Sequence, residues 1–164
     1  MRRFLTLGLI MVVAIGLVRG DNGKDGKEKH TDEHVVVKPA DIKWGPAPPG
    51  LPPGAEAAVL SGDPSKAGGL YTLRAKLPDG YVVPPHWHGS DENVTVLKGT
   101  LLIGKGMKLE ADHFQELTVG SFMRMPKEMR HYAKAKGETI IQVHGVGPFD
   151  ITYVNAADDP RKKK

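Results

Sequence analysis

Four residues near the middle of the chain have side chains that commonly bind metal ions. His86, His88 and Glu92 lie in a Val- and Thr-containing segment, residues 80–99. On an extended strand they would share one face, because side chains alternate between faces with a period of two. Two imidazoles and a carboxylate suit the divalent ions of iron, manganese, zinc, nickel or copper. Three ligands leave such an ion under-coordinated, and His131 is the best candidate for a fourth.

The spacing of these residues resembles the two sequence motifs of the cupin family. The first motif matches at all its fixed positions, which are Gly80, His86, His88, Glu92 and Gly99. The second matches at Gly120, Pro126 and His131. The resemblance covers residues 35–155. It implies a double-stranded β-helix, or jelly-roll barrel, that holds one divalent metal ion through His86, His88, Glu92 and His131.

One position departs from the second motif. Glu128 stands where the family usually has glycine. If that glycine serves to provide a positive φ, Glu128 must either adopt the same conformation under strain or reshape the turn.

Short apolar stretches separated by Gly, Pro and Asp predict the strands that position these side chains. Besides the motif segment, the expected strands are residues 35–37, 55–60, 70–77, 100–103, 139–146 and 151–154. Residues 139–146 are rich in β-branched side chains and are expected to form a central strand. The regular spacing of short strands, with no convincing amphipathic helix, predicts an all-β barrel or jelly roll.

The segment of residues 45–54 has an unusual composition, since five of its ten residues are proline. This excludes a regular helix or a central strand and predicts an extended crossing of the surface. We interpret it as a rigid connection rather than as a ligand for a proline-binding module. Trp44, just before it, is expected in the core.

His144 is the candidate for a further role at the site. It shares a strand face with Gln142, on a strand expected to lie close to the barrel interior. It would act as a general base, support a metal ligand or contact a substrate, and a hydrogen-bonded core histidine is an equally valid interpretation. His113 is expected in a loop, and His30 and His34 in a solvated tail.

The two ends of the chain differ from the middle. Residues 1–20 have a basic start, an uncharged apolar run and a small residue, Gly20, which is typical of a secretory signal peptide cleaved at that point. The apolar run is short for a membrane span of about twenty residues, so we prefer cleavage to anchoring. The charged residues 21–34 are expected to be a disordered linker, and residues 156–164 a basic tail. We therefore expect a secreted or periplasmic protein without a stable membrane span.

Composition limits the remaining possibilities. The chain has 164 residues and no cysteine, so we expect one domain, residues 35–155, without disulfides or thiolate ligands. The net charge of +4 falls to +1 without Arg2, Arg3 and Arg19. Since only a short tail is strongly basic, we expect no nucleic-acid partner.

These observations predict an exported protein that binds one divalent transition metal and a small-molecule substrate or ligand. The cupin family that the sequence resembles includes dioxygenases, isomerases, epimerases and decarboxylases, so the resemblance alone does not choose among these reactions. The mixed His and carboxylate ligands favour dioxygenase-type chemistry. A non-catalytic module that binds a metal or small ligand is the alternative, because apart from His144 no acid or base near the motifs stands out. A metal-free structural barrel is a third, less favoured hypothesis. The open edges of such barrels favour a homodimer.

Overall fold

The computed structural model describes residues 34–162, and most of its regular structure is β-strand. Within these residues the strands are β1 (Gly45–Pro46), β2 (Glu56–Gly62), β3 (Leu70–Leu77), β4 (Val82–Trp87), β5 (Glu92–Lys105), β6 (Gln115–Leu117), β7 (Phe122–Met125), β8 (His131–Val146) and β9 (Thr152–Tyr153). The 3-10 helices are η1 (Pro39–Asp41), η2 (Ala111–His113), η3 (Ala156–Asp158) and η4 (Pro160–Lys162). In this part of the chain, every helix is too short and too polar to cross a membrane.

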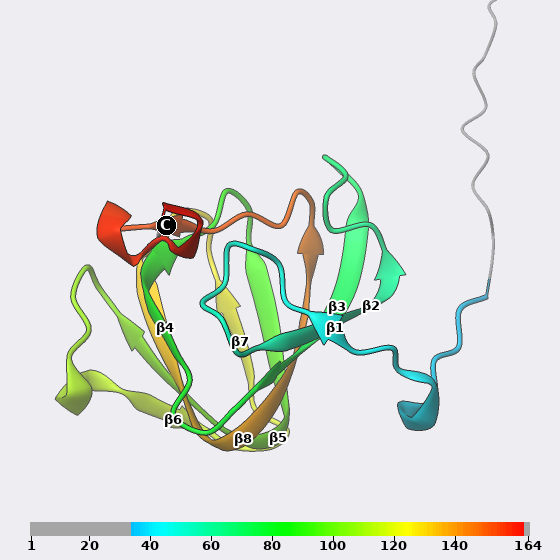
Figure 1. Ribbon diagram of the computed structural model, residues 1–164, viewed down its shortest axis with the longest axis horizontal. Coiled ribbons are helices and arrows are strands. Elements are labelled where there is room, and N and C mark those ends of the chain that lie inside the picture. The colour runs from blue at the N-terminus through cyan, green and yellow to red at the C-terminus, as the bar shows by residue number, and fades with distance from the viewer. Residues whose placement is uncertain (1–33, 163–164) are drawn as a thin grey trace, which may run out of the picture. The chain divides into compact units, whose positions relative to one another are not determined.

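The strands form one antiparallel sheet that curls over itself, which confirms the predicted all-β jelly roll (Figure 1). The two longest strands, β5 and β8, pair with each other along most of their length. The first half of β5 and the second half of β8 are flanked by β7 on one side and by β3, β2 and β1 on the other. Their remaining halves are flanked by β6 on one side and by β4 and β9 on the other. Each long strand therefore contributes to both layers of the roll.

A bend in the β5–β8 pair separates the two layers. The register of the pair shifts between Val96 and Thr100, and Gly99 within this stretch has a φ of 70°. A Cβ atom at Gly99 would overlap the carbonyl oxygen of Glu138 and the side chain of Thr139. Only glycine adopts this φ readily and also lacks the side chain that would collide with the neighbouring strand. The bend therefore requires glycine at the last position of the first motif.

The interior of the roll is an apolar core to which both layers contribute. Leu73 and Val143 are buried on one layer, and Leu101 and Ala135 on the other. β3 shows the pattern most clearly, because every second residue from Tyr71 onwards is buried. This alternation is expected for a sheet with one face on the core and one on solvent.

Most of the expected strands are present. Residues 55–60 largely coincide with β2, residues 70–77 with β3, and residues 139–146 form the second half of β8. The prediction for residues 35–37 is wrong, because they form no strand and Val36 is 67% exposed. Their β-branched side chains alone do not make a strand, since a strand also needs a partner with which to pair.

The proline-rich segment, residues 45–54, contains no helix and only the two-residue strand β1, as its prolines predict. We call it the strap. It is more than a surface crossing, because Gly50 is buried and its carbonyl oxygen accepts a hydrogen bond from the hydroxyl of Tyr153 (2.8 Å). Trp44, expected in the core, is only half-buried and lies under the ammonium group of Lys76.

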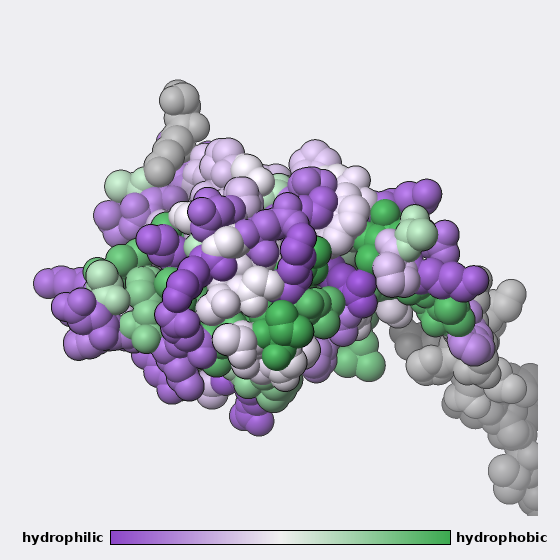
Figure 2. All heavy atoms as spheres, turned by 90° about the horizontal axis from the view of Figure 1, so that it is seen from below, coloured by the Kyte–Doolittle hydropathy of each residue, from purple (hydrophilic) through white to green (hydrophobic). Residues whose placement is uncertain are grey.

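Exposed hydrophobic side chains are dispersed over the surface. On the face seen in Figure 2, green hydrophobic residues form separate patches between purple hydrophilic ones. Leu70 and Val146, which are 77% and 43% exposed, lie opposite each other in the β3–β8 pair, whereas Met107, which is 66% exposed, follows the end of β5. Small groups of exposed apolar side chains of this kind are common on protein surfaces.

Residues 1–33 and 163–164 lie outside the described part of the chain. The expected signal peptide and most of the expected charged linker, with His30, fall there. His34, the first described residue, is exposed. At the other end, the described part of the basic tail forms η3 and η4, and Arg161 pairs with Asp159 at 2.8 Å.

Candidate metal centre

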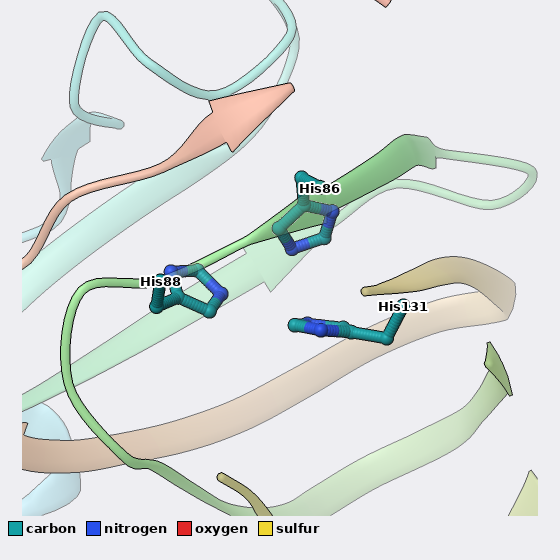
Figure 3. A group of neighbouring side chains, drawn as sticks. All are labelled: His86, His88 and His131. Atoms are coloured by element: carbon teal, nitrogen blue, oxygen red, sulfur yellow. The ribbon is translucent and has the colours of Figure 1, made fainter. Parts of the chain in front are cut away.

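Three histidine side chains converge inside the roll (Figure 3). His86 lies on β4, His88 follows that strand directly, and His131 begins β8, where it pairs with His86. One nitrogen atom of each ring lies within 4.8 Å of the others. All three side chains are buried. The cluster has the composition and the size of a site for one divalent metal ion.

Each of the three rings is oriented by a hydrogen bond between Nδ1 and a backbone carbonyl oxygen. The pairs are His86 with Pro84 (2.7 Å), His88 with Asp150 (2.5 Å) and His131 with Met129 (3.0 Å). Because a carbonyl oxygen only accepts hydrogen bonds, Nδ1 carries the proton and Nε2 keeps its lone pair. The three Nε2 atoms are therefore ready to bind a cation, and the hydrogen bonds fix the orientation of each ring.

Glu92 lies beside this cluster at the start of β5. Its Oε2 atom is 3.4 Å from Nε2 of His88 and 3.5 Å from Nε2 of His131. Burial disfavours its charge, but His88 and His131 outweigh this effect and hold the pKa of the carboxyl group well below its usual value. An ionised carboxylate thus stands next to the Nε2 atoms of His88 and His131, while the group of ligand atoms that all lie within 4.8 Å of one another consists of the three histidines alone.

The environment affects the protonation of His86 and His88 in opposite ways. Burial, together with the nearby His131 and His88, lowers the pKa of His86 from 6.5 to about 3. Burial also disfavours a charge on His88, but the adjacent Glu92 carboxylate raises the pKa of His88 above its ordinary value. At neutral pH, His86 is therefore in the neutral form that binds metal, whereas at His88 a metal ion competes with the proton that Glu92 favours.

The Nε2 atom of His88 shows that the arrangement fits a metal ion. It is buried and, within the described residues, has no hydrogen-bond partner. Its contact with Glu92 at 3.4 Å lacks the geometry of a hydrogen bond. A buried polar atom without a partner costs free energy, and a bound cation would remove that cost. Three imidazole nitrogens and one carboxylate oxygen suit a divalent ion of iron, manganese, zinc, nickel or copper.

The local structure that brings the ligands together differs from the expected one. The first motif is not a single strand, because β4 ends at Trp87 and β5 begins at Glu92. Residues 88–91, which include Gly, Ser and Asp, form an irregular crossing between the two layers. His86 and Glu92 therefore converge from two strands in different layers, and the prediction that alternation along one strand aligns them with His88 is wrong.

Asp150 fixes this crossing. Its carbonyl oxygen accepts a hydrogen bond from Nδ1 of His88, and its carboxylate accepts one from the backbone N–H of Gly89 (2.8 Å). Sequence reasoning missed Asp150, which is distant from both motifs. Every residue has a carbonyl group, so no sequence pattern indicates which one will orient a ligand.

The second motif contributes the turn that precedes His131. Glu128 has a φ of 63° and is the only non-glycine residue between 34 and 162 with a positive φ. Glu128 was expected either to adopt a positive φ under strain or to reshape the turn, and the structure shows the first of these outcomes. Its backbone N–H donates to the carbonyl oxygen of His88 (2.9 Å), so this turn also holds the crossing that carries His88.

The four residues border a cavity of about 60 Å³ inside the roll. Apart from them, all the lining side chains from the described part of the chain are apolar. Pro48 and Leu51 of the strap and Phe149 belong to this wall, and the Phe149 ring stacks on His88 with the ring centroids 5.7 Å apart. An ion at this centre would face a small apolar space.

The structure does not bring His144 to this cavity. Val143 faces the interior, so its neighbours Gln142 and His144 point outward from β8, and His144 is exposed beside Phe122. The expectation that this face lies toward the interior is wrong, because the pairing of β8 with β3 and β5 sets the opposite phase. His113 is exposed in the short helix η2.

Solved structures of other proteins have the same fold. The polyketide cyclase RemF from Streptomyces resistomycificus has a TM-score of 0.61 at 18% identity, over 78% of this chain and 90% of that chain. A proposed acetylacetone dioxygenase from Methylibium petroleiphilum has a TM-score of 0.59 at 17% identity, over 78% and 85%. KdgF from Halomonas sp. has a TM-score of 0.52 at 18% identity, over 71% and 96%. At these identities the similarity shows the fold alone.

The sequence comparisons are more specific. No curated protein matches the sequence. The profile of the ChrR cupin-like domain matches residues 32–150, which is more than half of the chain and includes all four residues of the centre. With its jelly-roll fold and buried histidine cluster, the chain thus belongs to the cupin superfamily, in the family of ChrR cupin-like domains.

Proposed function

We propose that this protein is an exported cupin that acts on a small molecule at a single divalent transition metal ion. The observation that carries the proposal is the convergence of three buried, correctly oriented Nε2 atoms. The carboxylate of Glu92 lies beside two of them. Such a group is costly to bury unless a cation compensates it.

His86, His88, Glu92 and His131 would hold the ion, which is one of iron, manganese, zinc, nickel or copper. When bound, the ion supplies either Lewis acidity or, if it is redox-active, oxygen chemistry. Dioxygenase-type chemistry is our preferred reaction because of the mixed nitrogen and oxygen ligands. The fold relative named as a proposed acetylacetone dioxygenase adds weak support. The chain's own contribution is to orient the ligands and to exclude water from the cavity.

A second candidate is a non-catalytic module in which the metal organises a binding pocket. The cavity wall favours this alternative, because within residues 34–162 Glu92 and the three histidines are the only lining residues able to transfer a proton. The two candidates differ in turnover. Oxygen uptake by protein loaded with iron, manganese, nickel or copper, with phenols, diketones and thiols, supports the enzyme; uptake equal to that of the free metal favours the module.

The metal assignment is tested with the double variant His86→Ala, His88→Ala. We expect it to contain no stoichiometric metal after purification without chelators, as measured by elemental analysis. The matched control is His113→Ala, His144→Ala, which changes two exposed histidines and should retain the wild-type metal content. Unchanged metal in the first double variant would refute the ligand assignment.

Export and assembly are separate parts of the proposal. Cleavage after Gly20 is the expected processing step, and N-terminal sequencing of the protein from a cell that exports it tests the position. A homodimer is the proposed assembly, since a second subunit often covers the sheet edges of barrels of this kind. Light scattering coupled to size-exclusion chromatography distinguishes it from a monomer.

A further inference from the structure

We propose that Pro48 and Leu51 of the strap make the metal cavity selective for a very small ligand that has one metal-binding group and an apolar remainder. The inference rests on the proposed metal-dependent function and names its ligand class. It assigns a specificity role to a segment that lies outside both sequence motifs.

The chemistry of the wall supports the apolar character of the ligand. The side chains from the described residues that line the cavity include no Lys, Arg, Ser, Thr, Asn or Gln. A hydroxyl, ammonium or phosphate group on a ligand would therefore lose its water without gaining a partner, unless it bound the metal itself. Sugars, phosphate esters and polycarboxylates do not fit this wall.

The size of the cavity limits the ligand further. An apolar protein cavity of about 150 Å³ accommodates benzene. The cavity here is about 60 Å³. By the same measure it has room for an apolar tail of about two to three carbon atoms, so an aromatic ring would require the wall to move.

The strap is held in place by hydrogen bonds at two points. The hydroxyl of Tyr153 donates a hydrogen bond to the carbonyl oxygen of Gly50, and the hydroxyl of Tyr81 donates one to the carbonyl oxygen of Pro52. The Tyr153 ring lies 6.0 Å from the ring of His86, so the same residue contacts the strap and approaches the metal centre. The position of Leu51 relative to the ligands is thereby fixed.

Close packing against the loop that follows β8 also restrains the strap. A Cβ atom at Gly50 would overlap the side chain of Ile151, another residue of the cavity wall. Five prolines further restrict the backbone of this segment. We infer that the strap forms a fixed part of the wall, and that the volumes of the Leu51 and Pro48 side chains limit the size of the ligand.

The test uses the full chain loaded with Co(II), whose absorption spectrum changes when a thiolate binds. Two probes have the same number of non-hydrogen atoms: 1-propanethiol has an apolar tail, and 2-mercaptoethanol ends in a hydroxyl. We expect propanethiol to bind at least about tenfold more tightly, because the wall leaves the hydroxyl without a partner. The chain has no cysteine, so its own side chains add no thiolate signal.

The role of Leu51 is tested with phenylmethanethiol, whose ring exceeds the cavity. Leu51→Ala should bind it at least about tenfold more tightly than the wild type does, since hydrophobic pockets discriminate by about this factor for small differences in volume. Leu109→Ala is the matched control, because Leu109 is 42% exposed and lies outside the cavity wall. Pro48→Ala provides a second test if Leu51→Ala does not fold, as judged by circular dichroism.

The outcomes separate the inference from the proposed function. If the wild-type protein binds no Co(II), the metal-dependent function fails, and the inference fails with it. If Co(II) binds but the two small thiols bind equally well, the inference alone fails. Equal binding of phenylmethanethiol by the wild type, Leu51→Ala and Pro48→Ala would likewise show that the strap does not limit the ligand.

Discussion

At the metal centre, the four candidate ligands are held in different ways. Each imidazole is oriented by a backbone carbonyl group, whereas the Oε2 atom of Glu92 lies 3.4 Å from Nε2 of His88 and 3.5 Å from Nε2 of His131. The histidines therefore provide the geometry of the site. Glu92 provides its negative charge, which attracts a cation and raises the pKa of His88.

Replacement of Glu92 by Gln should weaken metal binding without abolishing it. We expect the affinity to fall by at least about tenfold, because one charged ligand is lost while three nitrogens remain. Competition with a chelator of known affinity measures the change. Glu116→Gln, which removes an exposed ion pair with Lys136, is the control and should leave the affinity unchanged. An equal effect of both variants would argue against Glu92 as a ligand.

The metal-free protein should lose stability as the pH falls below 6.5. The pKa of His86 is about 3 in the folded state and 6.5 ordinarily, so in this interval only the unfolded chain binds a proton there. The loss reaches about 2 kcal/mol at pH 5. Since the pKa of His88 is raised, His88 is protonated in both states at pH 5 and adds little to the slope.

Urea unfolding in the presence of EDTA, measured between pH 7 and pH 5, tests this expectation. His86→Asn should show a flatter pH dependence than the wild type over the same range. Identical slopes for the two proteins would mean that His86 is not the group responsible.

Glu128 adopts a backbone conformation that favours glycine. With a φ of 63° it is strained, so Glu128→Gly should stabilise the protein by about 0.5–1 kcal/mol. Lys127→Gly, at the neighbouring position without a positive φ, should destabilise it instead. Urea unfolding at neutral pH measures both. A loss of stability in Glu128→Gly would show that the glutamate side chain contributes more than the strain costs.

At the scale of elements, the bend in the β5–β8 pair determines how the two layers meet. Gly99 lies at this bend, and its neighbours approach too closely to admit a side chain. Gly68 has a similar φ of 74°, but a Cβ atom there would meet nothing within 4 Å beyond its own chain neighbours. The two glycines thus separate the effect of conformation from that of close packing.

Gly99→Ala should therefore destabilise the protein far more than Gly68→Ala. We expect a loss of about 1 kcal/mol for Gly68→Ala, from the positive φ alone. For Gly99→Ala we expect about 3 kcal/mol or more, because overlap with the Glu138 carbonyl is added. Urea midpoints measure the difference, and equal losses would contradict a packing constraint at the bend.

The elements also show which features the sequence can reveal. The convergence of the three histidines was predictable because their identities and spacing belong to a motif, and β3 was predictable because one of its faces is buried. The phase of the second half of β8 was not, since Gln142 and Val143 are both compatible with an interior position until pairing with β3 and β5 is known. The burial of Gly50 depends on contacts with Ile151 and Tyr153, which are remote in sequence.

At the scale of the whole molecule, the centre connects segments from both layers of the roll. β4 supplies His86, β5 supplies Glu92 and β8 supplies His131. A site built from all three strands exists only in the folded state, so the binding free energy of an ion held there would add to the stability of the fold.

Metal should consequently raise the melting temperature. At a metal concentration about a hundredfold above the dissociation constant, the expected gain is about 2.7 kcal/mol, or roughly 8–10 °C. Differential scanning fluorimetry with added metal, compared with EDTA-treated protein, measures it. The His86→Ala, His88→Ala variant should show no such difference. A melting temperature that is indifferent to metal in the wild type would contradict binding to the folded state.

The hydrogen bond between His88 and Asp150 couples the metal centre to the loop that follows β8. His86 and His131 are oriented by carbonyl groups two residues earlier, but His88 depends on a residue sixty-two positions later. Ion binding and the docking of residues 147–151 are therefore reciprocal, and each must favour the other by the same free energy. The rate of amide hydrogen exchange in residues 147–151 should therefore depend on whether the metal site is occupied, although these residues lie outside both motifs.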